Sequence, residues 1–351
     1  MNSQEVPFDA LLLVSFGGPE GPDDVMPFLE NVLRGKNVPR ERMLEVAEHY
    51  QHFGGVSPIN EQNRQLMAAI KADLAEHKID LPVYWGNRNW HPMLPESLKS
   101  MQQDGVKKAM AFFTSAYSCY SGCRQYRENI MAAQEAIGPD APEVHKLRMF
   151  YNHPLYIDAT VERMRDALQP FSDDDPSKTH FVFTAHSIPL SMADNCKYST
   201  QLNETCRLAM DHFEGHSWDL VYQSRSGPPS QPWLEPDVCD FLETVAEQGV
   251  RQVVVMPVGF VSDHMEVLFD LDTEAKEKCD ELGIAMQRAK AVGTHAKFIE
   301  MIRHLILERK DGAEKLAIGK YPPNHDVCPV DCCLYTPTRP TRPAASIPKA
   351  D

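Results

Sequence analysis

The strongest constraint on the fold is a repeated alternation of short apolar segments with amphipathic ones. The apolar segments are rich in β-branched and other aliphatic residues and end in turns, as where residues 10–16 run into Gly17-Gly18-Pro19. Between such segments, residues 24–33 and 60–77 carry the periodicity of amphipathic helices. Strands that alternate with helices are typical of βαβ units, whose helices cover both faces of a parallel sheet. The sequence therefore predicts an α/β fold.

The second half of the chain repeats this pattern. Residues 105–110 resemble residues 249–254, and residues 83–88 resemble residues 221–225, at offsets of 144 and 138 positions. Chance similarity between buried strands is the alternative to an internal duplication. The 351 residues are enough for two domains of roughly 150 residues each. Two tandem domains would form a cleft lined by the carboxyl ends of their strands, where ligands of open α/β sheets bind.

We expect three regions in the chain. An N-terminal α/β domain covers residues 1–153 and a C-terminal α/β domain covers residues 154–318, with a hinge near residues 151–155. The regular pattern then stops, and a Pro-rich and Cys-rich extension covers residues 319–351. Such a composition is typical of an irregular segment, and we expect it to end as a flexible tail.

The charge of the chain excludes some partners. Lys and Arg sum to 35 and Asp and Glu to 50, which gives a formal net charge of −15. This balance argues against nucleic acid and anionic membranes, although a local basic pocket could hold an acidic ligand. No apolar run reaches the ~18 residues that span a bilayer, and the first residues lack signal-peptide features, so we expect a cytoplasmic protein without a transmembrane segment. The glycines match neither a dinucleotide nor a Walker motif, so NAD and ATP are not expected.

His186 is the first candidate for chemistry. It directly follows the apolar residues 179–185, which places it at the carboxyl end of a strand, where catalytic side chains gather. An imidazole titrates near neutral pH and suits general acid–base work. A buried histidine satisfied by backbone groups is the alternative.

An acidic cluster at the start of a later helix is the second candidate. Asp263, His264 and Glu266 follow an apolar strand, and helical spacing places Glu266, Asp270 and Glu274 on one ridge. Like charges at this spacing destabilise a helix by roughly a few tenths of a kcal/mol per pair. Carboxylates beside an imidazole suit a divalent cation that is passed on rather than locked in place. A solvated acidic helix face is the alternative.

Polar loops after other elements offer ligands for an acidic group. Arg88 lies in residues 86–90 and Ser224 lies in residues 223–227, and each could hold a carboxylate. Residues 54–58 add a hydroxyl group after a helix.

The cysteines point to a metal. The chain has nine of them, and Cys328, Cys332 and Cys333 lie within six residues, which fits three ligands of a metal centre. Cys119 and Cys123 are the candidates for a fourth ligand. Zinc usually takes Cys-x-x-Cys pairs, which this segment lacks, whereas an iron–sulfur cluster accepts more varied spacing. Free thiols without a metal are the alternative.

Taken together, these segments resemble the ferrochelatase family from residue 11 to about residue 308. Several motifs in the family's order carry the resemblance: residues 183–189 (FTAHSIP), Gln223-Ser224, residues 232–234 (PWL) and residues 259–266 (GFVSDHME). Phe16 and residues 86–90 and 121–126 are most similar to actinobacterial-type members. Those members insert iron into coproporphyrin III rather than protoporphyrin IX.

The resemblance implies two tandem flavodoxin-like, chelatase-type domains with a porphyrin cleft between them. It implies that His186 accepts pyrrole protons, binds the incoming iron, or does both. Glu266 would face it across the macrocycle as a base or metal ligand. The rest of the acidic cluster would support this pair: Asp263 and His264 would orient it, and Asp270 and Glu274 would extend it as an iron or proton path.

The resemblance also implies contacts with the porphyrin. Hydroxyl groups and a guanidinium would lie near the propionates, and two aromatic side chains would line the cleft: Tyr50, Ser57, Arg88 and Ser224 form the first group, and Phe16 and Trp233 form the second. Phe16 stands where some relatives have Tyr or Met, so a phenol ligand is lost and packing remains. Coproporphyrin carries four propionates, which an acidic protein can hold only with local donors such as Arg88.

Some ferrochelatases carry a 2Fe–2S cluster held by three C-terminal cysteines and one internal cysteine. This chain shows the pattern in Cys328, Cys332 and Cys333, although the Cys-x-x-x-Cys-Cys spacing differs from the animal arrangement. We favour Cys123 over Cys119 as the fourth ligand, because Cys119 also occurs at the matching position of relatives without a cluster.

The sequence thus predicts a lyase of haem biosynthesis that inserts Fe²⁺ into coproporphyrin III. The alternatives are a protoporphyrin IX ferrochelatase, a cobalt chelatase for another tetrapyrrole, a non-catalytic haem or metal carrier, and a flavodoxin-like electron carrier. The last of these leaves His186 and the acidic cluster unexplained. We expect a monomer whose partners are coproporphyrin III, Fe²⁺ and a downstream enzyme of the haem pathway.

Overall fold

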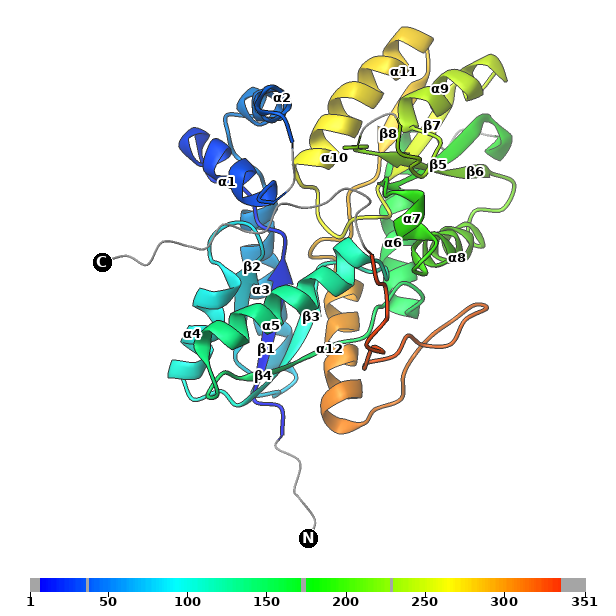
Figure 1. Cartoon of the computed structure of the whole chain (residues 1–351). Helices are drawn as coiled ribbons and strands as arrows, with labels where there is room; N and C mark the ends of the chain where they lie inside the picture. The colour runs from blue at the N-terminus through cyan, green and yellow to red at the C-terminus, as the bar shows by residue number, and fades with distance from the viewer. Residues whose placement is uncertain (1–6, 36–37, 172–174, 228–229, 336–351) are drawn as a thin grey trace.

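The computed structural model describes residues 7–35, 38–171, 175–227 and 230–335, which form two α/β domains (Figure 1). Each domain contains a four-stranded parallel sheet flanked by helices. The tandem α/β fold expected from the sequence is therefore confirmed. Within these ranges, no helix is both long enough and apolar enough to span a bilayer.

The first domain has the strand order β2-β1-β3-β4. Every residue of β1 is buried, as expected for an inner parallel strand covered on both faces. The strands are β1 (Ala10–Ser15), β2 (Val83–Asn87), β3 (Lys108–Phe113) and β4 (Glu143–Lys146). The helices are α1 (Val25–Val32), α2 (Arg40–His52), α3 (Ile59–Glu76), α4 (Leu94–Gln103) and α5 (Gln125–Ile137), with a 3₁₀ turn at Pro22–Asp24 and a π-helical turn at Tyr120–Arg124.

The second domain repeats this order as β6-β5-β7-β8, which matches the first four strands of a flavodoxin-like sheet. Its strands are β5 (Thr179–His186), β6 (Ser217–Gln223), β7 (Gln252–Met256) and β8 (Ala285–Arg288). Its helices are α6 (Pro154–Leu168), α7 (Leu190–Ala193), α8 (Tyr198–Met210), α9 (Val238–Glu247), α10 (Met265–Phe269), α11 (Lys276–Leu282) and α12 (Ala296–Asp311). Shorter turns are 3₁₀ at Gln169–Phe171 and Pro176–Lys178, and π-helical at Asp270–Ala275.

Equivalent elements recur 144 positions apart, the larger of the two offsets noted in the sequence. Helices α4 and α9 begin at residues 94 and 238, and strands β3 and β7 begin at residues 108 and 252. Gly105 (φ 83°) and Gly249 (φ 91°) follow the two helices in the left-handed conformation that glycine adopts readily. The bonds His91-Pro92 and Glu235-Pro236, which precede the two helices, are both cis. The positions of the helices and strands therefore support an internal duplication.

Helix α12 joins the two domains. It packs against α6 of the second domain and against α3 and β3 of the first. Phe298 on α12 is fully buried, and its ring lies 5.7 Å from Phe150 and 6.1 Å from Phe112 on β3. Arg303 donates to Asp73 on α3 over 2.9 Å. Because α12 packs partly on the first domain, the predicted boundaries at residues 153 and 318 stay a prediction.

A buried ion pair fastens the end of α12. Arg148, which follows β4, donates to both carboxylate oxygens of Glu308 over 2.6 and 2.8 Å, and both side chains are at most 2% exposed. Arg148 also donates to the carbonyl of Leu316 over 2.7 Å. Beyond this point, the described residues 319–335 contain no helix or strand. The predicted flexible tail falls mainly on residues 336–351, outside the described residues.

We expect Glu308→Gln to destabilise the fold strongly. The substitution leaves the Arg148 guanidinium buried without its counter-charge, a change that costs about 3–5 kcal/mol in free energy of unfolding. Urea denaturation measures this loss. Glu300→Gln on the same helix removes only partly exposed contacts with Arg303 and His304 and should cost below about 1 kcal/mol. Equal effects of the two substitutions would contradict the interpretation.

Candidate active site

The two residues expected to carry the chemistry lie in contact. His186 ends β5, and Glu266 is the second residue of α10, which follows β7. His186 Nδ1 lies 3.4 Å from Glu266 Oε2, and the side chains are 32% and 45% exposed. The fold brings the two together because β5 and β7 are parallel neighbours, whose carboxyl ends meet at one edge of the sheet.

The expectation that Glu266 faces His186 across a macrocycle is wrong in this structure. A ring between the two groups needs a van der Waals separation of about 3.5 Å on each of its sides, or roughly 7 Å in all. The observed separation of 3.4 Å leaves no such space. In this structure the two groups therefore lie together and not on opposite faces of a ring.

The surroundings of Glu266 keep it ionised at neutral pH. Burial acts to raise the pKa of Glu266, but the neighbouring His186 more than offsets this effect, and the pKa falls to about 2. His264 caps α10, since its Nδ1 accepts a hydrogen bond from the backbone N–H of Glu266 over 3.2 Å. The His264 ring packs against Phe260, and burial lowers the pKa of His264.

Asp270 lies one turn further along the chain, as the first residue of the π-helical turn that continues α10. Its carboxylate accepts hydrogen bonds from Gln223 Nε2 over 3.1 Å and from the Ser224 hydroxyl. Gln223 Nε2 also donates to the carbonyl of Glu266 over 3.3 Å. Burial raises the pKa of Asp270 to about 7, and the charge of Glu266 adds to this effect against the opposing hydrogen bonds. A carboxyl that titrates near neutral pH beside an ionised one can accept and release protons.

The acidic ridge continues through a π-helical turn at Asp270–Ala275, a feature often found at functional sites. The charge of Glu274 reaches Asp270 and contributes to its raised pKa. Burial and the charge of Asp237 raise the pKa of Glu274 in turn. Helical spacing predicts the succession of these carboxylates, whereas the π-helical turn and the approach of Asp237 arise only in the folded chain.

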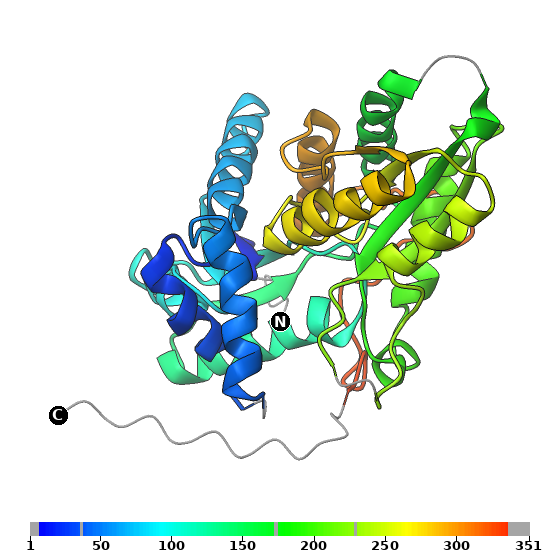
Figure 2. The same ribbon diagram turned by 90° about the horizontal axis from the view of Figure 1, so that it is seen from above.

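Asp263 holds the loop before α10 in place. Its carboxylate accepts from Arg288 Nη1 on β8 over 2.8 Å. Its backbone N–H donates to Gln62 Oε1 on α3 over 2.9 Å, and its carbonyl accepts from Gln62 Nε2 over 2.7 Å. Nearby, the ring of His49 on α2 stacks on that of Phe269 on α10, with their centres 3.9 Å apart, where the two helices approach each other (Figure 2). The first domain thus positions the loop and helix that carry Glu266.

Arg88 and Phe16 lie together on the first domain. The Arg88 guanidinium lies 5.7 Å from the centre of the exposed Phe16 ring and 4.7 Å from that of Tyr126. Its Nε donates to Asn129 Oδ1 over 2.8 Å, and its Nη1 donates to the carbonyl of Ser121 over 3.4 Å. These described partners are uncharged, so the guanidinium can meet an anionic ligand with its full charge.

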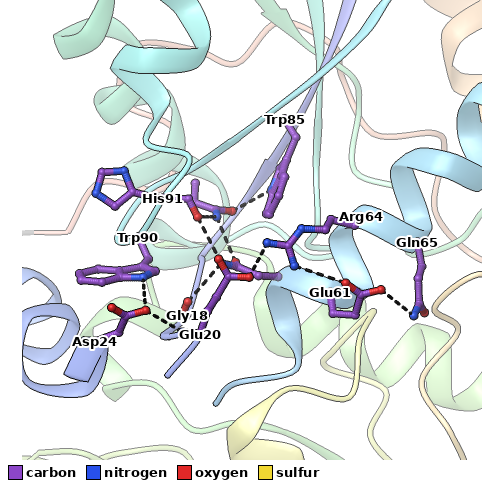
Figure 3. A network of polar contacts seen from close by, with 11 residues as sticks. Gly18, Glu20, Asp24, Glu61, Arg64, Gln65, Trp85, Trp90 and His91 are labelled. Atoms are coloured by element: carbon purple, nitrogen blue, oxygen red, sulfur yellow. Dashed lines mark hydrogen bonds and ion pairs between the residues drawn. The ribbon is translucent and has the colours of Figure 1, made fainter. Parts of the chain in front are cut away.

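A buried polar network fixes the loops that carry Phe16 and Arg88 (Figure 3). Asn60 Nδ2 on α3 donates to the carbonyls of Gly18 and His91, each over 3.2 Å. Asn87 Nδ2 donates to Asn60 Oδ1 over 3.2 Å. At the rim of this network, Arg64 pairs with Glu20 and Glu61, and Trp90 donates to Asp24. Sequence reasoning missed Asn60, because an isolated amide in a helix carries no pattern.

Three further residues were expected near a porphyrin. Tyr50 lies within reach of Glu266, whose charge adds to burial in raising the pKa of Tyr50. Ser57 is buried against Gly18, where an added Cβ would lie 2.6 Å from that of Ser57. Trp233 is buried, and its Nε1 has no hydrogen-bond partner among the described residues. Contacts of these residues and of Ser224 with a ligand stay predictions.

The cysteines of the extension meet those of the first domain. Cys328 packs against the apolar cluster that contains Cys123, which lies in the π-helical turn before α5. The interaction between the two thiols raises the pKa of Cys123 and lowers that of Cys328. Cys332 Sγ lies 3.6 Å from Cys333 Sγ. Cys119 Sγ instead accepts from the backbone N–H of Gly122 over 3.1 Å and caps the turn. All nine cysteines are free of disulfides.

His325 joins these thiols, and sequence reasoning missed it. The donor atoms of His325, Cys328 and Cys332 all lie within 4.8 Å of one another, a separation that one metal site can bridge. His325 Nε2 lies 3.9 Å from Cys332 Sγ. Lys146 Nζ donates to the carbonyl of His325 over 2.9 Å and holds this part of the extension on β4. The sequence signal that could have revealed it is the His-x-x-Cys spacing of His325 and Cys328.

Solved structures with the same fold define the class of protein. SirB from Bacillus subtilis with Fe³⁺ matches with a TM-score of 0.54 over 87% of this chain and 98% of that chain, at 9% identity. The sirohydrochlorin chelatase SirB from Bacillus subtilis subspecies spizizenii in complex with cobalt matches with a TM-score of 0.50 over 87% and 96%, at 10% identity. The chain therefore has the tandem α/β fold of chelatase-type proteins.

Sequence comparison defines the family within this class. The ferrochelatase family model matches residues 8–310. A ferrochelatase from Rhodopirellula baltica is 61% identical over 340 residues, covering 96% of this chain and 97% of that protein. A coproporphyrin III ferrochelatase from Streptomyces griseus is 49% identical over 363 residues, covering 97% and 96%. The chain belongs to the ferrochelatase family of metal-insertion enzymes.

The raised pKa of Asp270 predicts a pH dependence that Asp270→Asn removes. The folded protein keeps this proton up to about pH 7, whereas the unfolded chain releases it near the ordinary pKa of about 3.9. The folded state therefore binds more protons between about pH 4 and 7, and the free energy of unfolding falls as the pH rises through that window. Relative to the variant, the wild type should lose on the order of a few kcal/mol across it.

Urea denaturation at several pH values measures this difference. Asp280→Asn, on the exposed side of α11, is the matched control and should leave the pH dependence as in the wild type. Parallel stability curves for the wild type and Asp270→Asn would show that Asp270 titrates normally.

Proposed function

We propose that the chain inserts Fe²⁺ into coproporphyrin III, with His186 and Glu266 as the reacting pair. The 3.4 Å contact between these side chains carries the proposal, because it offers an imidazole and an ionised carboxylate to one substrate. The Streptomyces griseus relative is named for coproporphyrin III, and the Rhodopirellula baltica relative is named as a ferrochelatase. Arg88 supplies a cation for one propionate, because the groups that its guanidinium already binds, Asn129 and the carbonyl of Ser121, carry no charge.

The pair suits a ferrous ion approaching one face of the ring. Two ligand atoms at about 2.1 Å from one ion lie roughly 3.4 Å apart when they subtend a tetrahedral angle. His186 Nδ1 and Glu266 Oε2 show this separation. The two side chains can therefore hold Fe²⁺ as it exchanges water for pyrrole nitrogens.

Proton removal uses the same groups. A free porphyrin carries two N–H groups in a flat ring, and binding that bends the ring exposes the nitrogen lone pairs. His186 accepts a pyrrole proton, since imidazole is the side chain most often used as a general base. Asp270, with a pKa of about 7, passes protons on towards Glu274. In each turnover two N–H bonds break, two protons leave and the iron stays ferrous.

His186→Ala and Glu266→Gln should each lower the rate of iron insertion at least about 100-fold, because each removes an acid–base group or metal ligand. Porphyrin binding, followed by quenching of porphyrin fluorescence, should remain measurable. The exposed substitutions His212→Ala and Glu281→Gln are the controls and should leave the rate unchanged. Normal turnover in either active-site variant would contradict the role proposed for that residue. Tight porphyrin binding without turnover in the wild type would identify a carrier instead.

Porphyrin preference tests the substrate. We expect kcat/KM to be higher for coproporphyrin III than for protoporphyrin IX, and Arg88→Gln to raise KM for coproporphyrin III roughly tenfold through loss of a charged hydrogen bond. Arg42→Gln, an exposed position on α2, is the control. Equal or better rates with protoporphyrin IX would reassign the substrate to that porphyrin.

We also propose that the gathered thiols bind a 2Fe–2S cluster, with Cys123, Cys328, Cys332 and Cys333 as ligands. The contacts of Cys123 with Cys328 and of Cys332 with Cys333 support this set. The donor set fits, because thiolates are the usual ligands of such clusters. A bound cluster would supply a one-electron redox group and cross-link the start of α5 to the extension.

Protein purified without oxygen should be reddish-brown, and Cys332→Ser should lose the colour and the visible absorbance together with its iron. Cys239→Ser, at a partly buried thiol on α9, is the control and should keep both. Colourless wild-type protein with no bound iron or sulfide would rule out the cluster while leaving the chelatase proposal intact.

A further inference from the structure

The π-helical turn Tyr120–Arg124 and the start of α5, which follows it, connect the extension to Arg88. Both side-chain hydrogen bonds of Arg88 that the structure describes go to Ser121 and Asn129, and its nearest aromatic ring is that of Tyr126. These three residues belong to the π-helical turn or to α5, whereas Phe16 adds a longer ring contact from the loop after β1. The position of the Arg88 side chain therefore depends on where this turn and the start of α5 lie. A hydrogen bond between a guanidinium and a carboxylate depends on the orientation of both groups. A shift of the turn would therefore change the strength of the proposed contact between Arg88 and a propionate.

The π-helical turn is held in place by contacts with the C-terminal extension. Its residues Tyr120–Arg124 form a π-helical turn, a conformation that rarely occurs without a local cause. Arg124 Nη1 donates to the carbonyls of Val330 and Cys332 over 2.7 and 2.9 Å, and Arg124 Nε donates to Glu128 over 2.8 Å. The Arg124 side chain is only 16% exposed. Three charge-assisted hydrogen bonds thus clamp the turn between the extension and α5.

The carbonyls that Arg124 binds have little other support. Residues 330–332 belong to a described segment that has no helix or strand, so no regular hydrogen-bond ladder fixes them. On its other side the turn meets the second domain, where Ser121 Oγ lies 3.9 Å from Met192 Sδ on α7. The turn therefore sits where the extension, the first domain and the helix after β5 come together.

We propose that Arg124 is a positioning residue for the porphyrin, which holds the 120–124 turn against the extension and thereby sets Arg88 for the substrate's carboxylates. The inference rests on the proposed contact between Arg88 and a propionate. It gives the extension a role in substrate binding that is separate from any redox chemistry of its cysteines. Arg124 acts through Arg88 and does not touch the reacting atoms.

The test compares KM with kcat in the full-length protein. Arg124→Gln should raise KM for coproporphyrin III roughly fivefold to tenfold and change kcat less than about twofold, because it weakens binding without altering the reacting pair. The tetramethyl ester of coproporphyrin III, which has no ionised carboxylates, should show no such increase. Arg124→Lys keeps a cation for the carbonyls and should show a smaller increase. It also serves if Arg124→Gln folds poorly.

A double-mutant cycle decides whether Arg124 acts through Arg88. In the Arg88→Gln background, Arg124→Gln should have no further effect on KM, since the group it positions is gone. Additive effects, an unchanged KM in Arg124→Gln, or an equal increase with the ester would each overturn the proposal. If Arg88→Gln alone leaves KM unchanged, the proposed propionate contact fails as well. Iron content, measured for each variant, should not track the change in KM.

Discussion

The structure depends on one constraint: parallel strands deliver their carboxyl ends to the same edge of a sheet. In the second domain this brings the end of β5, with His186, beside the segment after β7, which carries Glu266. In the first domain it brings the loops after β1 and β2 together, with Phe16 and Arg88. The chemistry that we propose for this protein uses side chains from both of these edges.

The two domains would move relative to each other if only the loops at the carboxyl ends of their strands were in contact. Helix α12 prevents this by packing Phe298 among aromatic side chains of the first domain while lying against α6. The bonds of Gln62 to the backbone of Asp263 then fix the loop before α10 from the first domain. Burial of apolar surface thus holds the two domains together. A few hydrogen bonds between the domains then fix the position of the loop that precedes Glu266.

Much of this could be predicted from the sequence because it is local. Alternating patterns predicted the strands and helices, and helical spacing predicted the succession of Glu266, Asp270 and Glu274. The separation of the pair could not be predicted, since it depends on two elements far apart in the chain, and the expected arrangement across a macrocycle is wrong here. Asn60 was missed because its partners come from distant segments. His325 was missed although its thiol partners are local, because a lone His-x-x-Cys spacing was not considered as a metal motif.

The sequence by itself determined which side chains follow which strands, the similarity of segments in the two halves and the crowding of cysteines in the extension. Those properties follow from periodicity and spacing along one chain. Only the tertiary structure decided that His186 and Glu266 lie in contact, that Cys123 rather than Cys119 lies beside Cys328, and that Arg124 binds the extension. These outcomes depend on distances between segments, which packing sets to within an ångström and which no local pattern encodes.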